Sequence, residues 1–182
     1  MGRLCLLGAI AVGFLFFAAS RATMTNDQPS AKPAAGLELL RVELPDGDRW
    51  LLGERGLGRP FVARLLLTNR GETPLKIWHP DCTEGSAAAG VWLIPGDGKK
   101  LILRRKPVER AAGVATAKTI KPNEVVRIDL ELLRLIDSKS PAAGTYRVVG
   151  VYENDLPRVE QITVWSGRLE KAADHAISIV RP

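Results

Sequence analysis

Potential metal ligands lie together at one place in the chain, His79-Pro80-Asp81-Cys82. An imidazole and a thiolate three residues apart are soft ligands that can hold copper or zinc, so His79 and Cys82 form a candidate metal site. A blue-copper site needs a second histidine and usually a methionine, but the only other histidine lies near the C-terminus and no methionine lies beyond residue 24. The alternative is a turn stiffened by Pro80, in which Asp81 accepts a backbone hydrogen bond. We therefore expect no cofactor and keep the metal site as an alternative.

The same turn offers a thiol nucleophile, Cys82, with His79 as its base. Pro80 stands between them, and the sequence shows no third group to orient the imidazole. The chain also lacks the Gly-x-Ser-x-Gly, His-Glu-x-x-His, Gly-x-x-x-x-Gly-Lys and Gly-x-Gly-x-x-Gly motifs of common catalytic and nucleotide sites. We therefore predict a protein that is not an enzyme.

Aromatic and basic side chains form the second kind of candidate, a binding surface. Tryptophan rings stack on sugars, but we expect the four tryptophans to bury their large apolar area in the core. The alternative is a sugar-binding surface, for which Trp78 and Trp92 are the better candidates, because they lie out of phase with their apolar neighbours or near strand ends. A basic stretch could dock an anionic polymer or lipid surface, or simply keep a hairpin edge soluble. It contains Lys99, Lys100, Arg104, Arg105, Lys106 and Arg110.

The first 22 residues have the order of a secretory signal peptide. Arg3 precedes an uncharged apolar run, residues 4–19, which ends in small residues before Arg21 and Ala22. The run is shorter than the roughly 20 residues that a membrane-spanning helix needs. We expect cleavage after Ala22 and a periplasmic or secreted protein. The alternative is a retained inner-membrane anchor formed by residues 4–19.

Length and composition limit the remaining possibilities. The chain has 182 residues, 46% of them apolar, and a net charge of +6, which suit one domain with a packed core. The charge is mild and diffuse, which argues against a nucleic-acid partner and is compatible with an anionic envelope surface. Cys5 lies in the signal segment, so Cys82 has no partner for an internal disulfide, and we expect it to be buried or half-buried.

The pattern after the signal segment is that of short strands. Residues 23–36 are polar and small and read as a flexible leader, and residues 37–182 read as one domain. Apolar and polar residues alternate in several segments, which is the period of half-buried strands, and Asp97-Gly98 predicts a hairpin turn. The expected strands are residues 37–44, 61–69, 74–78, 91–95, 100–104, 125–130, 145–152, 161–165 and 176–180, with a loop at 107–118 and a short helical crossing at 132–136.

These strands predict an all-β domain, an antiparallel two-sheet sandwich of the immunoglobulin-like type that follows an N-terminal signal helix. Tyr146 stands at the start of a late strand, just after Gly144. This is the position of the tyrosine corner in immunoglobulin-like sandwiches, where the hydroxyl bonds to backbone a few residues upstream.

The order LTNRGETPLKIW, GVWLIPGDGKKLIL, TIKPNEVVRIDLEL and PAAGTYRVVGVYEN resembles bacterial immunoglobulin-like domains of the BsuPI-type proteinase inhibitor family. It also resembles exported bacterial proteins that end in a similar Tyr-Glu-Asn to Trp-Ser-Gly-Arg stretch. The resemblance covers residues 61–154 and rests on turn and core positions. These are Asn69, Gly98, Pro122, Gly144 and Tyr146. It implies a scaffold, and it makes proteinase inhibition one candidate activity.

We therefore expect an exported, non-catalytic binding or structural module of the bacterial cell envelope. Its partner would be an envelope or extracellular protein, bound through loops or an edge strand, with the membrane involved only if the signal segment is retained. One alternative is a proteinase inhibitor that inserts the loop at residues 107–118 into a protease cleft. The other is a small copper or zinc protein that uses His79 and Cys82.

Overall fold

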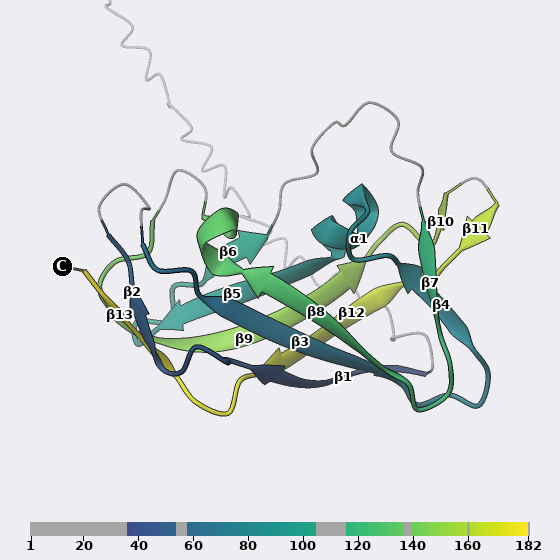
Figure 1. Cartoon of the computed structure of the whole chain (residues 1–182), viewed down its shortest axis with the longest axis horizontal. Helices are drawn as coiled ribbons and strands as arrows, with labels where there is room; N and C mark the ends of the chain where they lie inside the picture. The colour runs from purple at the N-terminus through teal and green to yellow at the C-terminus, as the bar shows by residue number, and fades with distance from the viewer. Residues whose placement is uncertain (1–35, 54–57, 105–115, 137–139, 160, 182) are drawn as a thin grey trace, which may run out of the picture.

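The computed structural model describes residues 36–53, 58–104, 116–136, 140–159 and 161–181, and the chain in these ranges is mostly β-strand (Figure 1). The signal segment and nearly all of the leader lie outside the described residues, as do Arg105, Lys106 and Arg110. Within the described residues, no helix has the length and apolar character needed to cross a membrane.

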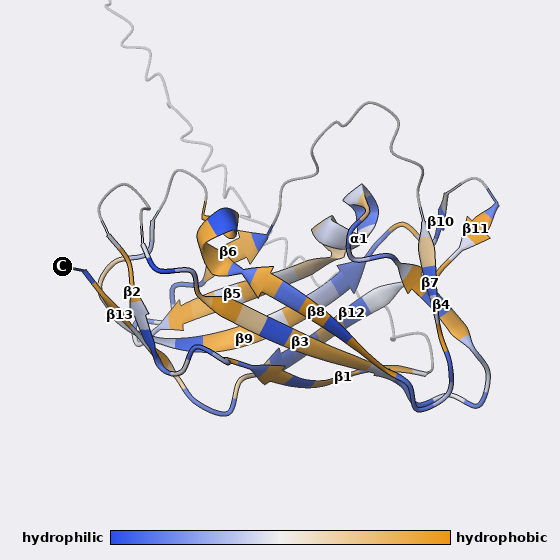
Figure 2. Ribbon diagram, in the orientation of Figure 1, coloured by the Kyte–Doolittle hydropathy of each residue, from blue (hydrophilic) through white to orange (hydrophobic). Residues whose placement is uncertain are grey.

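The first sheet has three antiparallel strands in the order β1-β3-β8. They are β1 (Leu37–Glu43), β3 (Val62–Asn69) and β8 (Val125–Glu131). Along β8 the buried residues alternate with exposed ones, as expected from the sequence. Figure 2 shows successive apolar and polar bands along β8. One face of the sheet therefore joins the core and the other meets solvent.

The second sheet has six strands, with β9 at its centre. Its order is β2 (Arg49–Leu51), β13 (Ile177–Val180), β9 (Gly144–Asn154), β5 (Ala89–Pro95) and β6 (Leu101–Arg104), and β12 (Gly167–Ala172) also pairs with β9. The expected hairpin is confirmed, because β5 and β6 pair across the Asp97-Gly98 turn. β2 and β13 pair in parallel, which departs from the wholly antiparallel arrangement that we expected.

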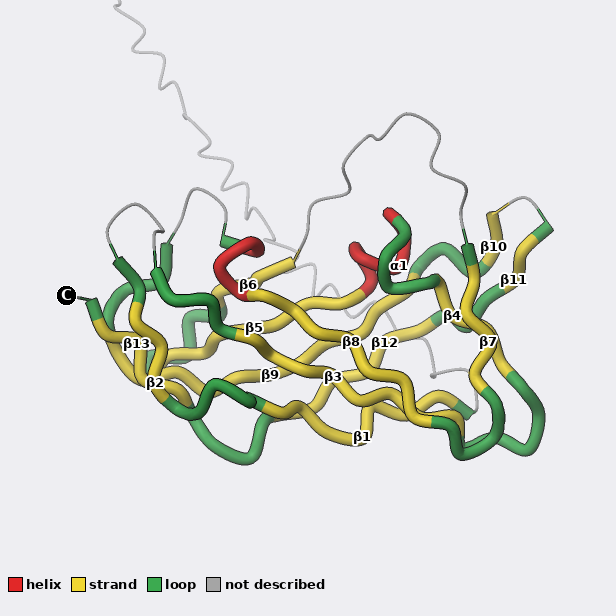
Figure 3. Tube along the Cα trace, viewed as in Figure 1, coloured by secondary structure: helices red, strands yellow, loops and turns green. Residues whose placement is uncertain are grey.

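Two small sheets and two short helices complete the fold (Figure 3). β4 (Leu75–Trp78) pairs with β7 (Ala117–Ile120), and β10 (Arg158–Val159) pairs with β11 (Ile162–Thr163). The helical crossing expected after β8 is a 3-10 helix, η2 (Leu132–Leu135). α1 (Thr83–Ala88) was not predicted, because six residues are too few to show a helical period.

The C-terminal part differs from the sequence prediction in two places. β12 lies at residues 167–172, where no strand was expected, and only Ile162–Thr163 of the expected strand 161–165 is extended and paired. The loop expected at 107–118 lies mostly outside the described residues, and its last two residues belong to β7.

The two main sheets pack against each other around one core, to which β1, β3, β8, β5 and β9 all contribute. The two sheets come into close contact at Gly150 of β9. A Cβ atom on this residue would lie 2.5 Å from Cγ2 of Val42 and 3.2 Å from Cγ of Leu65. Those residues belong to β1 and β3, so a glycine is needed for the sheets to meet at this distance.

Two polar side chains fix the ends of the sheets. The buried amide of Asn69 donates to the carbonyl groups of Thr73 and Ile120 and accepts from the backbone N–H of Gly71. The hydroxyl of Tyr146 donates to the carbonyl oxygen of Ala142 at 2.9 Å, which confirms the upstream bond expected for this tyrosine. These four bonds satisfy backbone groups where strands turn.

The closeness of the sheets predicts the effect of a methyl group at Gly150. We expect Gly150→Ala to lower the free energy of unfolding by about 1–3 kcal/mol, because the added carbon overlaps Val42 and Leu65 in a filled core. Gly96→Ala is the matched control, because an added Cβ there has no atom within 4 Å. Urea unfolding of both variants makes the comparison. Equal stabilities would show that the sheets lie further apart than described.

Candidate functional site

The turn that holds His79 and Cys82 uses its polar atoms for the backbone. Sγ of Cys82 accepts from the backbone N–H of Gly85 at 3.4 Å and caps α1. Nδ1 of His79 accepts from the backbone N–H of Asp81 at 3.3 Å. A Cβ atom on Gly85 would overlap the carbonyl group of His79, so the helix packs directly on the turn. The arrangement is that of a capped turn, and Cys82 is half-buried as expected.

A buried phenol lies behind this turn. Tyr152 of β9 is fully buried, and its hydroxyl has no hydrogen-bond partner among the described residues. Burial raises the pKa of Tyr152 well above its ordinary value, and the neighbouring Cys82 raises it further. The phenol is therefore neutral at physiological pH and cannot act as an anionic ligand or base. No three His, Cys, Asp or Glu side chains converge on a metal position anywhere in the described ranges.

Trp78 is not a surface residue, and the expectation that the tryptophans are buried is confirmed for it. Its ring is fully buried, and its Nε1–H donates to the carbonyl oxygen of Leu156 at 3.1 Å. Ile77, which precedes it, is also fully buried, because β4 contacts other elements on both of its faces. Trp78 therefore joins the β4–β7 pair to the segment after β9 and offers no surface to a ligand.

Trp92 lies on the outer face of the second sheet and is covered by cations. Only 8% of the residue is exposed, and it packs with Val149 and Val151 in a small apolar cluster. Nζ of Lys100 lies 3.2 Å from the centroid of its ring, and Cζ of Arg168 lies 4.7 Å from it. Trp92 is therefore not an exposed ring either, because long basic side chains cover it.

The structure brings together three of the predicted binding residues, Trp92, Lys100 and Arg104, on this face. Arg104 is not a free cation, because its guanidinium donates to Glu153 at 2.8 Å. Lys99 is exposed in the hairpin turn, and Arg105 lies outside the described residues. A sugar ring would have to displace Lys100 before it could stack on Trp92. The face is better described as a solubilised sheet surface than as an open site.

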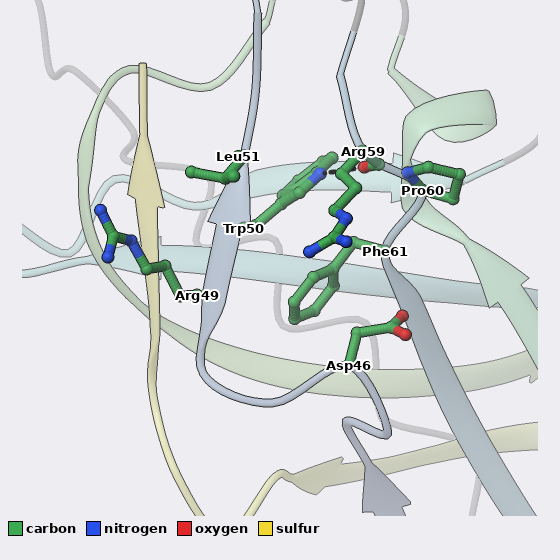
Figure 4. Close-up of a pocket in the computed structure, with 7 residues that line it drawn as sticks. All are labelled: Asp46, Arg49, Trp50, Leu51, Arg59, Pro60 and Phe61. Atoms are coloured by element: carbon green, nitrogen blue, oxygen red, sulfur yellow. Dashed lines mark hydrogen bonds between the residues drawn. The ribbon is translucent and has the colours of Figure 1, made fainter. Parts of the chain in front are cut away.

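A pocket of about 410 Å³ lies beside β2. Its floor is the stacked pair Trp50 and Phe61, with ring centroids 5.6 Å apart, and Nε1–H of Trp50 donates to the carbonyl oxygen of Arg59. Arg59 lines the pocket together with these rings, and Figure 4 shows Arg49 pointing away from them. Asp46 accepts from the backbone N–H of Val62 at 2.7 Å. The lining residues carry two guanidinium groups, of Arg49 and Arg59, and one carboxylate but no nucleophile.

The most distinctive polar surface is the free edge of β8. Leu132 donates its N–H to the carbonyl of Phe61, and Asn69 donates to the carbonyl of Glu124. β3 and β8 pair without a register shift between these two bonds. The two bonds therefore determine which residue pairs of β3 and β8 are hydrogen-bonded and which are not. Val126, Ile128 and Leu130 bond to β3, so the N–H and C=O groups of the intervening residues point away from it.

Those outward groups belong to Val125, Arg127 and Asp129. Within the described part of the chain, β8 has β3 as its only strand neighbour, and no backbone hydrogen bond satisfies these outward groups. A groove of about 180 Å³ runs along the same edge. It is lined by Pro80, Asp81, Ser86 and Ala89 on one side and by residues 127–130 on the other.

Charged side chains line the solvent face of this edge. Asp129 accepts from Nε of Arg64 at 2.8 Å and from Nη2 of Arg127 at 2.6 Å. The bond from Arg64 is the main cause that lowers the pKa of Asp129, and Arg127 lowers it further, against a smaller opposing effect of burial. The carboxylate is therefore ionised throughout the neutral range, and two guanidinium groups share it.

Sequence analysis identified the alternation of β8 but not its edge. The residues that line the groove come from the turn before α1, from α1, from the start of β5 and from β8, so no local motif marks it. Comparisons with known protein families, curated proteins and solved structures find no match to this chain. The resemblance to inhibitor-type domains therefore stays a prediction.

The capping role of Cys82 predicts the behaviour of two variants. Serine is a strong N-cap residue, so Cys82→Ser should leave the melting temperature unchanged or raise it. Cys82→Ala removes the cap and should lower the free energy of unfolding by about 0.5–1 kcal/mol. Thermal unfolding measures both, and native mass spectrometry of the unmodified chain measures bound metal. One equivalent of copper or zinc that is lost in both variants would contradict a purely structural role.

The shared carboxylate predicts a pH dependence. A lowered folded pKa means that Asp129 stabilises the fold above its unfolded value and loses this contribution as the pH falls through the folded pKa. We expect Asp129→Asn to cost less than about 1 kcal/mol near pH 7, since the group is partly exposed, and nothing near pH 2. Denaturant titrations across this range measure the difference. Asp174→Asn is the control, and a pH-independent gap between Asp129→Asn and the unmodified chain would contradict the ion-pair explanation.

Proposed function

We propose that this protein is an exported, non-catalytic binding module with an immunoglobulin-like sandwich, and that it acts in the cell envelope by adding a strand of a partner protein to β8. One observation carries this proposal, the unpaired outer edge of β8 with its outward N–H and C=O groups. Strand addition uses such groups for affinity and the neighbouring side chains for specificity.

Several features support the immunoglobulin-like assignment and the exported location. The hydroxyl of Tyr146 bonds upstream at the start of β9, as in a tyrosine corner, and β9 lies at the centre of one of two facing sheets. The N-terminal sequence has the charge and apolar run of a signal peptide. An exported chain meets envelope proteins, which is where its partner would be found.

The free edge is well suited to pairing. β8 is seven residues long and keeps one register with β3, without the bulge or proline that often blunts an edge. Charged residues on its solvent face discourage pairing with arbitrary strands. A partner must therefore match Arg127 and Asp129, so the same charges that protect the edge make it selective.

The other candidate functions lack supporting geometry among the described residues. The loop expected to enter a protease cleft lies mostly outside the described ranges. At the candidate metal site, Sγ of Cys82 caps a helix and Nδ1 of His79 accepts a backbone bond. Neither observation favours inhibition or metal binding over strand addition.

The proposal predicts how β8 exchanges its amide hydrogens. In the dilute purified protein, the N–H groups of Arg127 and Asp129 should exchange rapidly, while those of Val126 and Ile128 should be protected. In intact cells, a benzophenone side chain placed at Val125 should crosslink to a partner protein, whereas the same group at Asp174 should not. Protected Arg127 and Asp129 amides in the isolated chain, or equal crosslinking at both positions, would contradict the proposal.

A further inference from the structure

The edge of β8 also specifies the chemistry of its partner. We infer that the added segment carries an acidic side chain beside Arg127 on its outer face and small apolar side chains on its inner face. This inference rests on the proposed strand addition and deepens it, because it names the kind of peptide that the edge selects.

The residues of β8 whose N–H and C=O groups point away from β3 determine where each side chain of an added strand would lie. The incoming backbone must bond to the outward groups of Val125, Arg127 and Asp129. Residues directly opposite these three point their side chains to the same solvent face, and the residues between them point inward. An added segment therefore has one set of positions next to charged residues and another next to the core.

The inner positions face the groove beside α1. The apolar part of its lining is formed by Pro80, Ala89, Ile128 and Leu130, which lie on the inner side. Arg127 and Asp129 line its outer side, Ser86 adds a hydroxyl, and Asp81 has 91% of its side chain exposed. The groove of about 180 Å³ is narrow. Small apolar side chains such as valine fill such a space and bury apolar surface, whereas a charged one would lose its water.

The outer positions face an excess of positive charge. Asp129 is the carboxylate that Arg127 contacts, and Arg64 shares it. Glu43 does not neutralise the charge of Arg127, because Glu43 pairs with Arg64 and Arg41. The side chain of Arg127 is 59% exposed, so part of its guanidinium remains available to a carboxylate on the neighbouring strand. Opposite charges in this cross-strand position stabilise pairing.

A second copy of this chain fits the edge less well. Two β8 strands could place Arg127 of one copy opposite Asp129 of the other, but each Asp129 already accepts from Arg64 and Arg127 of its own chain, so these groups would supply four guanidinium groups and only two aspartates. The turn at Pro80–Asp81 and α1 flank the edge, which favours a single strand over a whole sheet. A separate acidic segment balances the charge and fits the groove.

The test uses two peptides that read the same in both directions, so that parallel and antiparallel binding present the same side chains. They are acetyl-Thr-Val-Glu-Val-Thr-amide and its counterpart with lysine at the centre. Each peptide is titrated into the chain from which only the signal segment, residues 1–22, has been removed. The backbone amide signals of β8 are followed by NMR. We expect shifts at Arg127 and Asp129, with the glutamate peptide binding about fivefold more tightly.

Charge reversal on the protein makes the test specific. Arg127→Glu should reverse the preference so that the lysine peptide binds more tightly. Arg147→Glu changes the net charge equally on the outer face of the other sheet and should leave the preference unchanged. Amide spectra of both variants verify that each is folded before titration.

The outcomes separate this inference from the proposed function. Equal binding of both peptides, with shifts at Arg127 and Asp129, would overturn the acidic preference and leave strand addition standing. Failure of both peptides to shift β8 would overturn both. Shifts of the same amides that grow with protein concentration alone would assign the edge to a second copy and overturn the inference.

Discussion

The close contact between the two sheets at Gly150 is the constraint on which the rest of the structure depends. Val42 and Leu65 fill the space that a side chain on β9 would occupy, so β1 and β3 lie in one position against the second sheet. Once β3 is placed, its unbroken pairing with β8 follows along the whole strand. A shift by one residue would turn the apolar face of β8 to solvent, so the register is tightly specified.

That register has a chemical consequence at the edge of the sheet. The residues of β8 with exposed side chains are also those whose backbone groups point away from β3, so charge and unused hydrogen bonds occur at the same positions. Arg64, Arg127 and Asp129 keep this surface hydrated. They also place positive and negative charges at different points of this surface, and a selective contact needs such a pattern.

Features that depend on residues close together in the sequence could be predicted, whereas features that depend on contacts between distant residues could not. Val126, Ile128 and Leu130 alternate with polar residues, and that local pattern correctly predicts β8. β12 has no such pattern and is extended because β9 offers it an edge. The phase of Trp78 made it a candidate for exposure, because the local pattern does not show that Ile77 and Trp78 on opposite faces of β4 are both covered. The free edge of β8 could not be predicted, since it depends on which strands are neighbours in space.

The pairing of β2 with β13 links the two ends of the domain. Trp50 of β2 lies opposite Ile179 of β13, and both are buried in the same core. The second sheet therefore stays incomplete until residues 177–180 have been synthesised. Because β2 and β13 lie far apart in sequence, their pairing has a large loop-closure cost, which is typical of the slower-folding domains of this size.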